Sequence, residues 1–88
     1  MLWGVIIMKE IGEIFSYYEK IGVAAIKLNG SIKVGDRIKI QGHTTNFEQD
    51  VGSMQIEHKK VANARKGDEI GIKVIDRVRR HDKVYKVE

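Results

Sequence analysis

Apolar and polar residues alternate along most of this 88-residue chain, and a period of two is typical of half-buried β-strands. Within residues 37–41, Ile38 and Ile40 point to one side and the polar residues between them point to the other. Residues 22–28 and residues 69–74 show the same alternation. The pattern predicts a strand in each of these three places.

Turn residues stand at the ends of the predicted strands. Asn29-Gly30 is a strong hairpin signal, because a type I′ turn needs positive φ at both central residues. Gly35-Asp36 and Gly67-Asp68 each precede an alternating run, and His81-Asp82 begins a looser third copy. In the first two copies glycine permits a tight turn, and aspartate can accept hydrogen bonds from the amides of the turn. We therefore interpret all three copies as strand entrances rather than active-site motifs.

The remaining elements complete an all-β prediction. A strand is expected at about residues 50–58, one turn of helix at 61–65, and a closing strand around Val84 and Val87. Six short strands with almost no helix favour a small closed six-stranded antiparallel barrel of the Greek-key type, with Phe15 filling its interior. Closure would also remove the exposed strand edges of an open sheet.

The length of the chain predicts one domain, at residues 9–88, after an apolar extension at residues 1–8. This extension, MLWGVIIM, is too short for a signal peptide or a membrane span. We expect it to pack as an extra edge strand or to precede a natural start at Met8; a peripheral membrane anchor is the remaining alternative. The absence of cysteine excludes disulfides and thiolate metal sites, and it fits a cytoplasmic location.

An ordered set of landmarks runs through residues 9–88. It consists of a Gly-x-Ile start at Gly12, the turn Val34-Gly35-Asp36, Val51-x-Ser53-Met54, and Val61-x-x-Ala64-x-x-Gly67-Asp68-x-x-Gly71 before the closing strand. Taken together, these landmarks resemble the second-domain β-barrel of the translational GTPases of the elongation factor Tu type. The stretch TTNFEQDVGSMQIEH is especially similar to the barrel appended to the C-terminus of the collagenase-like peptidase family, whose members include RNA-modifying proteins. The resemblance implies a translation-protein barrel and, in the GTPases, contacts with tRNA or ribosomal RNA.

The sequence predicts no catalytic or cofactor site. It contains no G-x-x-x-x-G-K-[ST] loop, so neither GTP hydrolysis in the manner of the GTPases nor a nucleotide cofactor is expected. His43, His58 and His81 lack metal-ligand spacing and are expected to face solvent. The hydroxyl groups of Thr44 and Thr45 have no evident base beside them. We therefore expect no enzyme activity, no metal and no cofactor.

The net charge of +4 is concentrated in residues 59–88, which hold ten Lys/Arg and five Asp/Glu. The candidate RNA-binding residues are Lys59, Lys60, Arg65, Lys66, Arg77, Arg79, Arg80 and Lys83. Neighbouring loops could place them on one rim of the barrel, where the planar fork of arginine suits phosphate. The alternative is an ion-pair network of the hyperthermophile type, in which Asp76, Asp82 and Glu69 neutralise these cations.

Tyr17 and Tyr18 add candidate groups for base stacking. They precede Glu19-Lys20 at the end of a predicted strand, so at least one is expected to face solvent and could stack on a base. The alternative is a tyrosine that caps the barrel mouth and keeps its hydroxyl in water.

Two functions follow from these observations and from the resemblance. The first is a non-catalytic module that binds RNA, either tRNA or ribosomal RNA, or a ribonucleoprotein. The second is a protein-interaction module that supplies the barrel in trans to a larger protein, with residues 1–8 as its docking strand. A contiguous basic rim that includes Arg77, Arg79 and Arg80 would favour the first function, and a bare apolar patch around Trp3 would favour the second.

Overall fold

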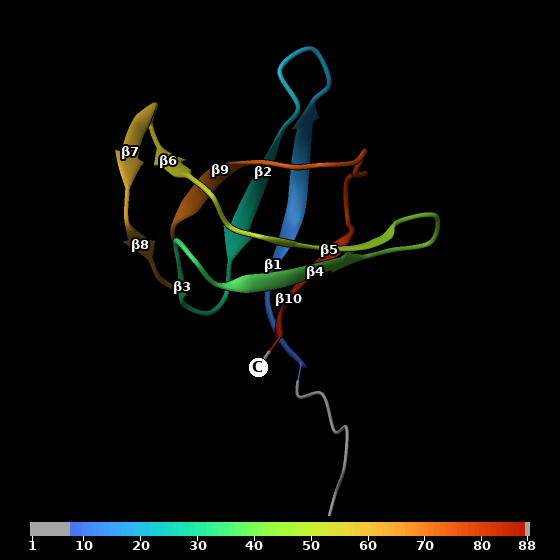
Figure 1. Ribbon diagram of the computed structural model, residues 1–88, viewed down its shortest axis with the longest axis horizontal. Helices are drawn as coiled ribbons and strands as arrows, with labels where there is room; N and C mark the ends of the chain where they lie inside the picture. Colours follow the sequence, from blue (N-terminus) through green and yellow to red (C-terminus); the bar gives the residue numbers. More distant parts are fainter. Residues whose placement is uncertain (1–7, 88) are drawn as a thin grey trace, which may run out of the picture.

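The computed structural model describes residues 8–87, and all their regular secondary structure is β (Figure 1). The ten strands are β1 Met8–Tyr18, β2 Val23–Leu28, β3 Ile32–Lys33, β4 Arg37–Gln41, β5 Asn46–Asp50, β6 Met54–Ile56, β7 Lys59–Val61, β8 Asn63–Ala64, β9 Glu69–Lys73 and β10 Lys83–Val87. The all-β prediction is therefore confirmed. The apolar extension expected at residues 1–8 lies outside the described residues except for Met8, which begins β1.

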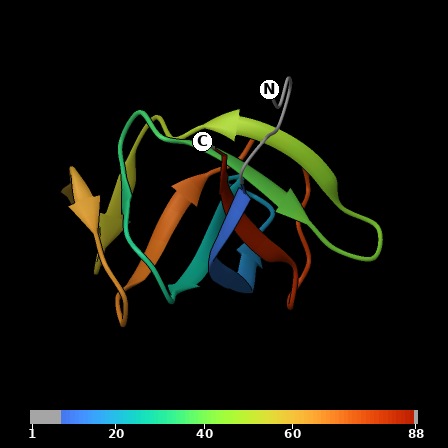
Figure 2. The same cartoon turned by 90° about the horizontal axis from the view of Figure 1, so that it is seen from below.

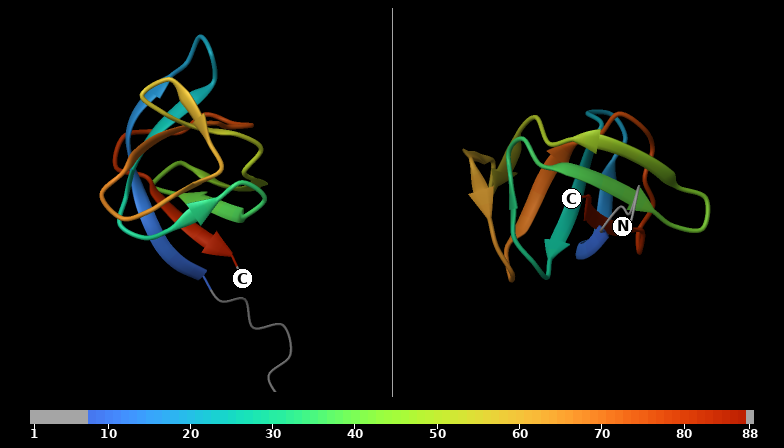
Figure 3. Two further views of the ribbon diagram at one scale, coloured as in Figure 1. Left: turned by 90° about the vertical axis from the view of Figure 1, so that its left-hand side faces the viewer. Right: turned by 60° about the horizontal axis from the view of Figure 1, so that its bottom comes forward.

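Eight strands form one sheet in the order β5-β4-β10-β1-β2-β9-β6-β7, and β3 pairs with β8 in a separate ladder. All the pairings are antiparallel. The sheet is strongly curled: β4 and β5 lie across β9, β2 and β1 (Figure 2), and the strands wrap around a common interior (Figure 3). Within residues 8–87 the ladder does not return from β7 to β5, so the predicted closed six-stranded barrel is not confirmed.

The sequence pattern missed the shortest elements. Strands of two or three residues are too short to show a period, and the helical turn expected at 61–65 is replaced by parts of β7 and β8. The hairpin expected at Asn29-Gly30 is also wrong, because β2 pairs with β1 and β9 whereas β3 pairs with β8. Instead, the Asn29 N–H donates to the Ile11 carbonyl at 2.8 Å, and Gly30 packs closely on the Ile11 side chain. The segment after β2 thus continues along β1 rather than reversing.

The core consists mainly of β-branched residues from the inner face of the curled sheet, and these suit strands because their χ1 angle is already restricted. The fully buried isoleucines are Ile11, Ile14, Ile26, Ile32, Ile38, Ile40, Ile70 and Ile72. Each contributes about 1.5–3 kcal/mol relative to an exposed position. The interior that residues 8–87 enclose is therefore filled by these side chains.

Two irregularities in β1 change which of its residues reach the core. Its register shifts between Glu10 and Gly12 against β10, and between Ile14 and Ser16 against β2. Each shift inserts one unpaired residue, which reverses the alternation of faces. Ile11 and Ile14 are consequently both buried, whereas Phe15 is only partly buried, contrary to the expectation that it fills the interior.

The three Asp-containing copies form the same four-residue turn. It spans Lys33–Asp36, Arg65–Asp68 and Arg79–Asp82, and in each the aspartate N–H donates to the carbonyl of the first residue at 3.0–3.1 Å. In each the aspartate Oδ2 also accepts the N–H of that first residue, at 3.0, 3.0 and 2.8 Å respectively. The third position has positive φ, which is 96° at Gly35, 95° at Gly67 and 78° at His81. A strand follows each aspartate directly, so the interpretation of all three copies as strand entrances is confirmed, and the copy without glycine forms the same turn as the other two.

The gap beside β5 is bridged by one side chain. Gln49 is only 6% exposed, and its amide nitrogen donates to the Lys73 carbonyl at 2.8 Å while its amide oxygen accepts the Ile75 N–H at 2.8 Å. The side-chain amide therefore makes the two hydrogen bonds that a neighbouring strand would otherwise make. It joins β5 to the chain that leaves β9.

We predict that Gly67→Ala lowers the free energy of unfolding by about 1–2 kcal/mol, because the left-handed conformation at φ 95° is costly for any residue with a Cβ. Gly52→Ala is the matched control: open space surrounds both glycines, but only Gly67 has positive φ. The control should be neutral or slightly stabilising. Urea denaturation of both variants measures the difference, and equal effects would contradict the assignment of the turn.

We predict that Gln49→Glu lowers the free energy of unfolding by about 1–3 kcal/mol at neutral pH, because a carboxylate cannot donate to the Lys73 carbonyl. Gln49→Ala should cost at least as much, since it leaves both backbone groups without a partner. Gln55→Glu, at an exposed position in β6, is the control and should change stability by less than about 0.5 kcal/mol. Chemical denaturation gives all three values, and a stable Gln49→Glu protein would show that the bridge contributes little.

Candidate nucleic-acid interface

The connection between β9 and β10, residues 74–82, carries three of the predicted RNA-binding residues on a well-anchored backbone. At its start the Val74 N–H donates to the Gly22 carbonyl at 2.9 Å, and the side chain of Val78 is buried in the core. At its end the His81 N–H donates to the Ile14 carbonyl, and the Ile14 N–H donates to the Asp82 carbonyl, both at 2.8 Å. The arginines of this segment therefore project from a fixed backbone.

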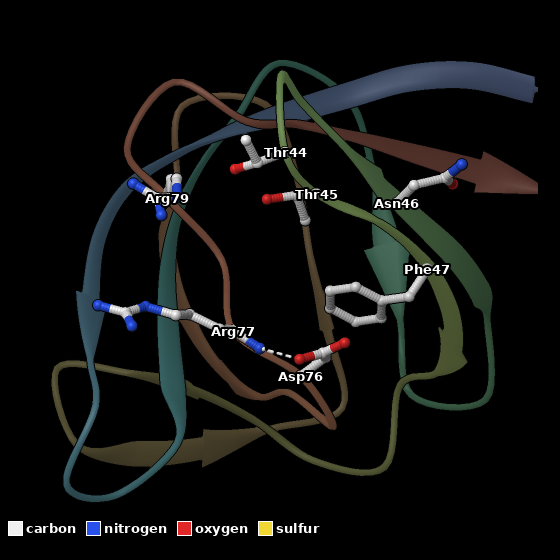
Figure 4. Close-up of a pocket in the computed structure, with 7 residues that line it drawn as sticks. All are labelled: Thr44, Thr45, Asn46, Phe47, Asp76, Arg77 and Arg79. Atoms are coloured by element: carbon white, nitrogen blue, oxygen red, sulfur yellow. Dashed lines mark hydrogen bonds between the residues drawn. The ribbon is translucent and has the colours of Figure 1, made fainter.

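Arg77 and Arg79 line a pocket of about 330 Å³ between this connection and the loop that joins β4 to β5. The other lining residues are Thr44, Thr45, Asn46, Phe47 and Asp76. Figure 4 shows the threonine hydroxyls turned toward the side of the pocket that the two arginines occupy, with the Phe47 ring on the opposite side. Two arginines, an aspartate, two threonines and an aromatic ring thus line one small space, and the guanidinium group of Arg77 points away from Phe47 (Figure 4).

The acidic residues nearest these arginines are bonded to the backbone instead of to the guanidinium groups. Asp76 Oδ1 accepts the Arg77 N–H at 2.7 Å, and Asp82 Oδ2 accepts the Arg79 N–H at 2.8 Å. Within residues 8–87, neither Arg77 nor Arg79 forms an ion pair through its side chain, and Glu69 forms none either. The alternative of an ion-pair network therefore does not account for this part of the surface.

Arg80 and Lys83 have partners within the fold. The Arg80 Nε donates to the Phe15 carbonyl at 3.0 Å, which the irregularity in β1 leaves available. Lys83 pairs with Glu13, whose second oxygen lies 3.3 Å from the His81 Nδ1. The hydrogen bond from Lys83, and then the one from His81, lowers the pKa of the Glu13 carboxyl, and Glu13 in turn raises the pKa of Lys83. Lys83 is therefore already neutralised, whereas Arg80 has no acidic partner among residues 8–87.

The other predicted cations lie elsewhere. Lys59 and Lys60 are exposed on β7, at the opposite end of the molecule from the connection between β9 and β10 (Figures 1 and 2). Arg65 and Lys66 lie in the second of the three turns, between β8 and β9. The structure thus divides the eight candidates between separate surfaces. It places Arg77 and Arg79 on one pocket, and Arg80 follows them in the same connection.

The two tyrosines have different surroundings. Tyr17 packs against the core, in keeping with the capping alternative, whereas Tyr18 is 52% exposed. Two further exposed apolar residues, which the sequence pattern did not single out, are Ile21 and Ile75, at 60% and 73% exposure. The hydrogen bond between Val74 and Gly22 brings their two loops together. The sequence does contain a signal that Ile75 is exposed: it is an apolar residue that directly follows the inward-facing Val74.

The part of the chain that the structure describes contains no group of three His, Cys, Asp or Glu residues arranged to hold a metal ion. His43, His58 and His81 are exposed, as expected. Residues 8–87 also include no helix with the length and hydropathy needed to cross a membrane.

No family model matches the chain. It is 47% identical over 77 residues to an uncharacterized protease of Methanocaldococcus jannaschii, a match that covers 86% of this chain and 19% of the relative. It is 35% identical over 80 residues to a collagenase of Porphyromonas gingivalis, covering 89% of this chain and 22% of that protein. The chain therefore spans about a fifth of the length of the curated relatives it matches.

Two solved structures share the fold. Both are the C-terminal domain of a protein from Geobacillus thermoleovorans assigned to the U32 peptidases, and one of them is its selenomethionine form. The selenomethionine form superposes with a TM-score of 0.83 at 19% identity and covers 86% of this chain and 96% of that domain. The other gives 0.82 at 20% identity. The similarity to collagenase-like proteins is thus supported by sequence and by fold, whereas the wider resemblance to elongation factor Tu is not confirmed and stays an expectation.

Proposed function

We propose that the chain is a non-catalytic accessory module that binds RNA, or an RNA surface of a ribonucleoprotein, in the cytoplasm. The binding surface is an arginine face, which we define as Arg77, Arg79, Arg80 and Tyr18. In this proposal the curled sheet is a variant of the translation-protein barrel that is open between β5 and β7. The longer relatives would then use a domain of this kind for binding and the rest of their chain for chemistry.

The observation that carries the proposal is that no carboxylate among the described residues, 8–87, pairs with the guanidinium group of Arg77 or Arg79. Both guanidinium groups stand on a fixed backbone, and the neighbouring carboxylates of Asp76 and Asp82 are engaged by backbone N–H groups. Guanidinium groups make paired, charge-assisted hydrogen bonds to phosphate oxygens. A phosphate backbone supplies the acceptors that the fold itself does not supply.

The exposed ring of Tyr18 favours RNA over a polyanion without bases, because the ring can stack on a base. This ring stands at the end of β1, and the bond from Arg80 to Phe15 attaches a guanidinium to the same strand three residues earlier. Three residues of a strand span about 10 Å, so a phosphate on the arginine and a base on the ring fit one short single-stranded segment. Base stacking of this kind tolerates any sequence.

A second function is favoured by a different observation. Tyr18, Ile21 and Ile75 are exposed apolar residues on two loops that a backbone hydrogen bond joins, and exposed apolar patches often mark protein contacts. In this alternative the chain is a protein-interaction module that supplies the domain in trans to a larger translation-related or RNA-modifying protein. The docking strand expected at residues 1–8 lies almost wholly outside the described residues.

We predict that the triple variant Arg77→Ala, Arg79→Ala, Arg80→Ala binds tRNA and ribosomal RNA fragments at least about tenfold more weakly than the parent chain. The slope of log affinity against log salt should fall in magnitude by about two or three, since each lost phosphate contact removes close to one unit. Fluorescence anisotropy across a salt series measures both quantities.

The matched control removes three positive charges from the other end of the molecule, by Lys59→Ala, Lys60→Ala and Lys66→Ala. It should change the affinity by less than about threefold. The double variant Arg77→Ala, Arg79→Ala leaves the bond from Arg80 to Phe15 in place and separates binding from folding. If the triple variant and its control lose the same amount of RNA affinity, binding depends only on net charge and not on the arginine face. Absence of RNA binding at low salt would reject the proposal.

A further inference from the structure

A second cationic pocket, of about 380 Å³, lies at the other end of β4, against the ladder of β3 and β8. Its polar lining includes Lys33, Arg65 and Lys86, together with Ser31 and Asn63. We propose that this pocket is a phosphate-binding site. The inference is independent of the arginine face, which contributes none of these residues.

The pocket exists because two of the Asp-containing turns meet. Lys33 and Arg65 are the first residues of the first and second turns, and the pairing of Ile32 with Ala64 and of Lys33 with Asn63 places these turns beside each other. A hydrogen bond of 2.9 Å from the Val34 N–H to the Ala62 carbonyl continues this contact. Two cations 32 positions apart in the sequence therefore line one pocket.

The aspartates of these turns leave the cations largely uncompensated. Asp68 Oδ2 accepts the Arg65 N–H at 3.0 Å, and Asp36 Oδ2 accepts the Lys33 N–H at 3.0 Å. Neither Lys33 nor Arg65 forms a side-chain ion pair within residues 8–87. As at the arginine face, the carboxylates stabilise the backbone of the turn while the positive side chains remain available.

Lys86 supplies the third cation from the core side of β10. It pairs with the buried Ile38 in the ladder, two residues after the buried Val84, and its side chain is only 22% exposed. Its ammonium group lies 3.4 Å from Asp36 Oδ2, the oxygen that already accepts the Lys33 N–H. A partly buried ammonium has three donors to satisfy, and one shared oxygen at this distance leaves it capacity for another acceptor.

The charges of the lining select the class of ligand. Three cations stand against two carboxylates, those of Asp36 and Asp68, so the pocket keeps an excess of positive charge that favours an anion. A phosphate group suits this lining, because arginine can hold two of its oxygens, lysine supplies point charges, and a hydroxyl and an amide add neutral donors. The group could belong to a nucleic acid backbone or to a small phosphorylated molecule, and both sources share this chemistry.

The two sites are separated by β4. This strand runs from Arg37, next to the first turn, to Gln41, just before the loop that lines the pocket of Arg77 and Arg79. Five residues of strand span about 17 Å. One RNA strand of several nucleotides can therefore reach both sites, whereas a single small molecule occupies only one.

The test is a titration of the ¹⁵N-labelled chain with inorganic pyrophosphate, followed through the backbone amides, with sodium acetate at equal ionic strength as the reference anion. We expect shifts concentrated at the amides of Ser31, Asn63 and Arg65, which acetate does not reproduce. The double variant Lys33→Gln, Arg65→Gln should weaken pyrophosphate binding at least about tenfold, and Lys59→Gln, Lys60→Gln should leave it unchanged. The variants that define the site are at exposed positions, so folding is preserved.

Equal shifts with acetate, or shifts confined to Arg77 and Arg79, would overturn the inference. The triple variant at Arg77, Arg79 and Arg80 separates the two proposals, because it should retain the pyrophosphate response even if RNA binding is lost or never existed. Oligonucleotides of increasing length identify the source of the phosphate. An affinity that rises with length points to a nucleic acid backbone, and one that matches a mononucleotide at every length points to a small phosphorylated ligand.

Discussion

The carboxylate of Asp82 is the group on which the position of the arginines depends. It is buried, its Oδ2 accepts the Arg79 N–H, and the carboxylate fills the space that a side chain at Gly42 would need. A buried carboxylate is tolerated only where hydrogen bonds compensate for lost hydration. Asp82, Gly42 and the turn consequently fix one another, and the attachment of the turn to Ile14 then sets the path of the whole connection.

The same arrangement explains why so much positive charge remains free on a chain with many acidic residues. In each of the three turns the aspartate is satisfied by a backbone N–H. Where strands place opposite charges side by side, as with Arg37 between Glu48 and Asp50, ion pairs do form. Within the part of the chain that the structure describes, charges are thus paired along the β4–β5 hairpin, whereas the side chains of Arg77 and Arg79 have no such partners.

Much of the fold can be predicted from the sequence. Strands of five or more residues show their period of two, and each glycine followed by aspartate forms a tight turn that leads into a strand. The rest depends on long-range contacts. Asn29-Gly30 has the composition of a hairpin turn, but contact with Ile11 decides its conformation. The irregularities of β1 depend on two different neighbouring strands, so no local pattern reveals them. For the candidate site, the sequence identified the basic residues, and only the tertiary structure shows which of them lie together.

The bridge made by Gln49 affects how this domain unfolds. A closed barrel opens only when a complete strand pairing breaks, whereas here two hydrogen bonds from one side chain hold β5 to the chain that follows β9. Local opening requires the least free energy where the fewest backbone bonds must break. This seam is therefore the natural site of partial unfolding. Its opening would free the N–H of Ile75, while the bond from Val74 to Gly22, the buried Val78 and the ladders on either side keep the arginine segment in place.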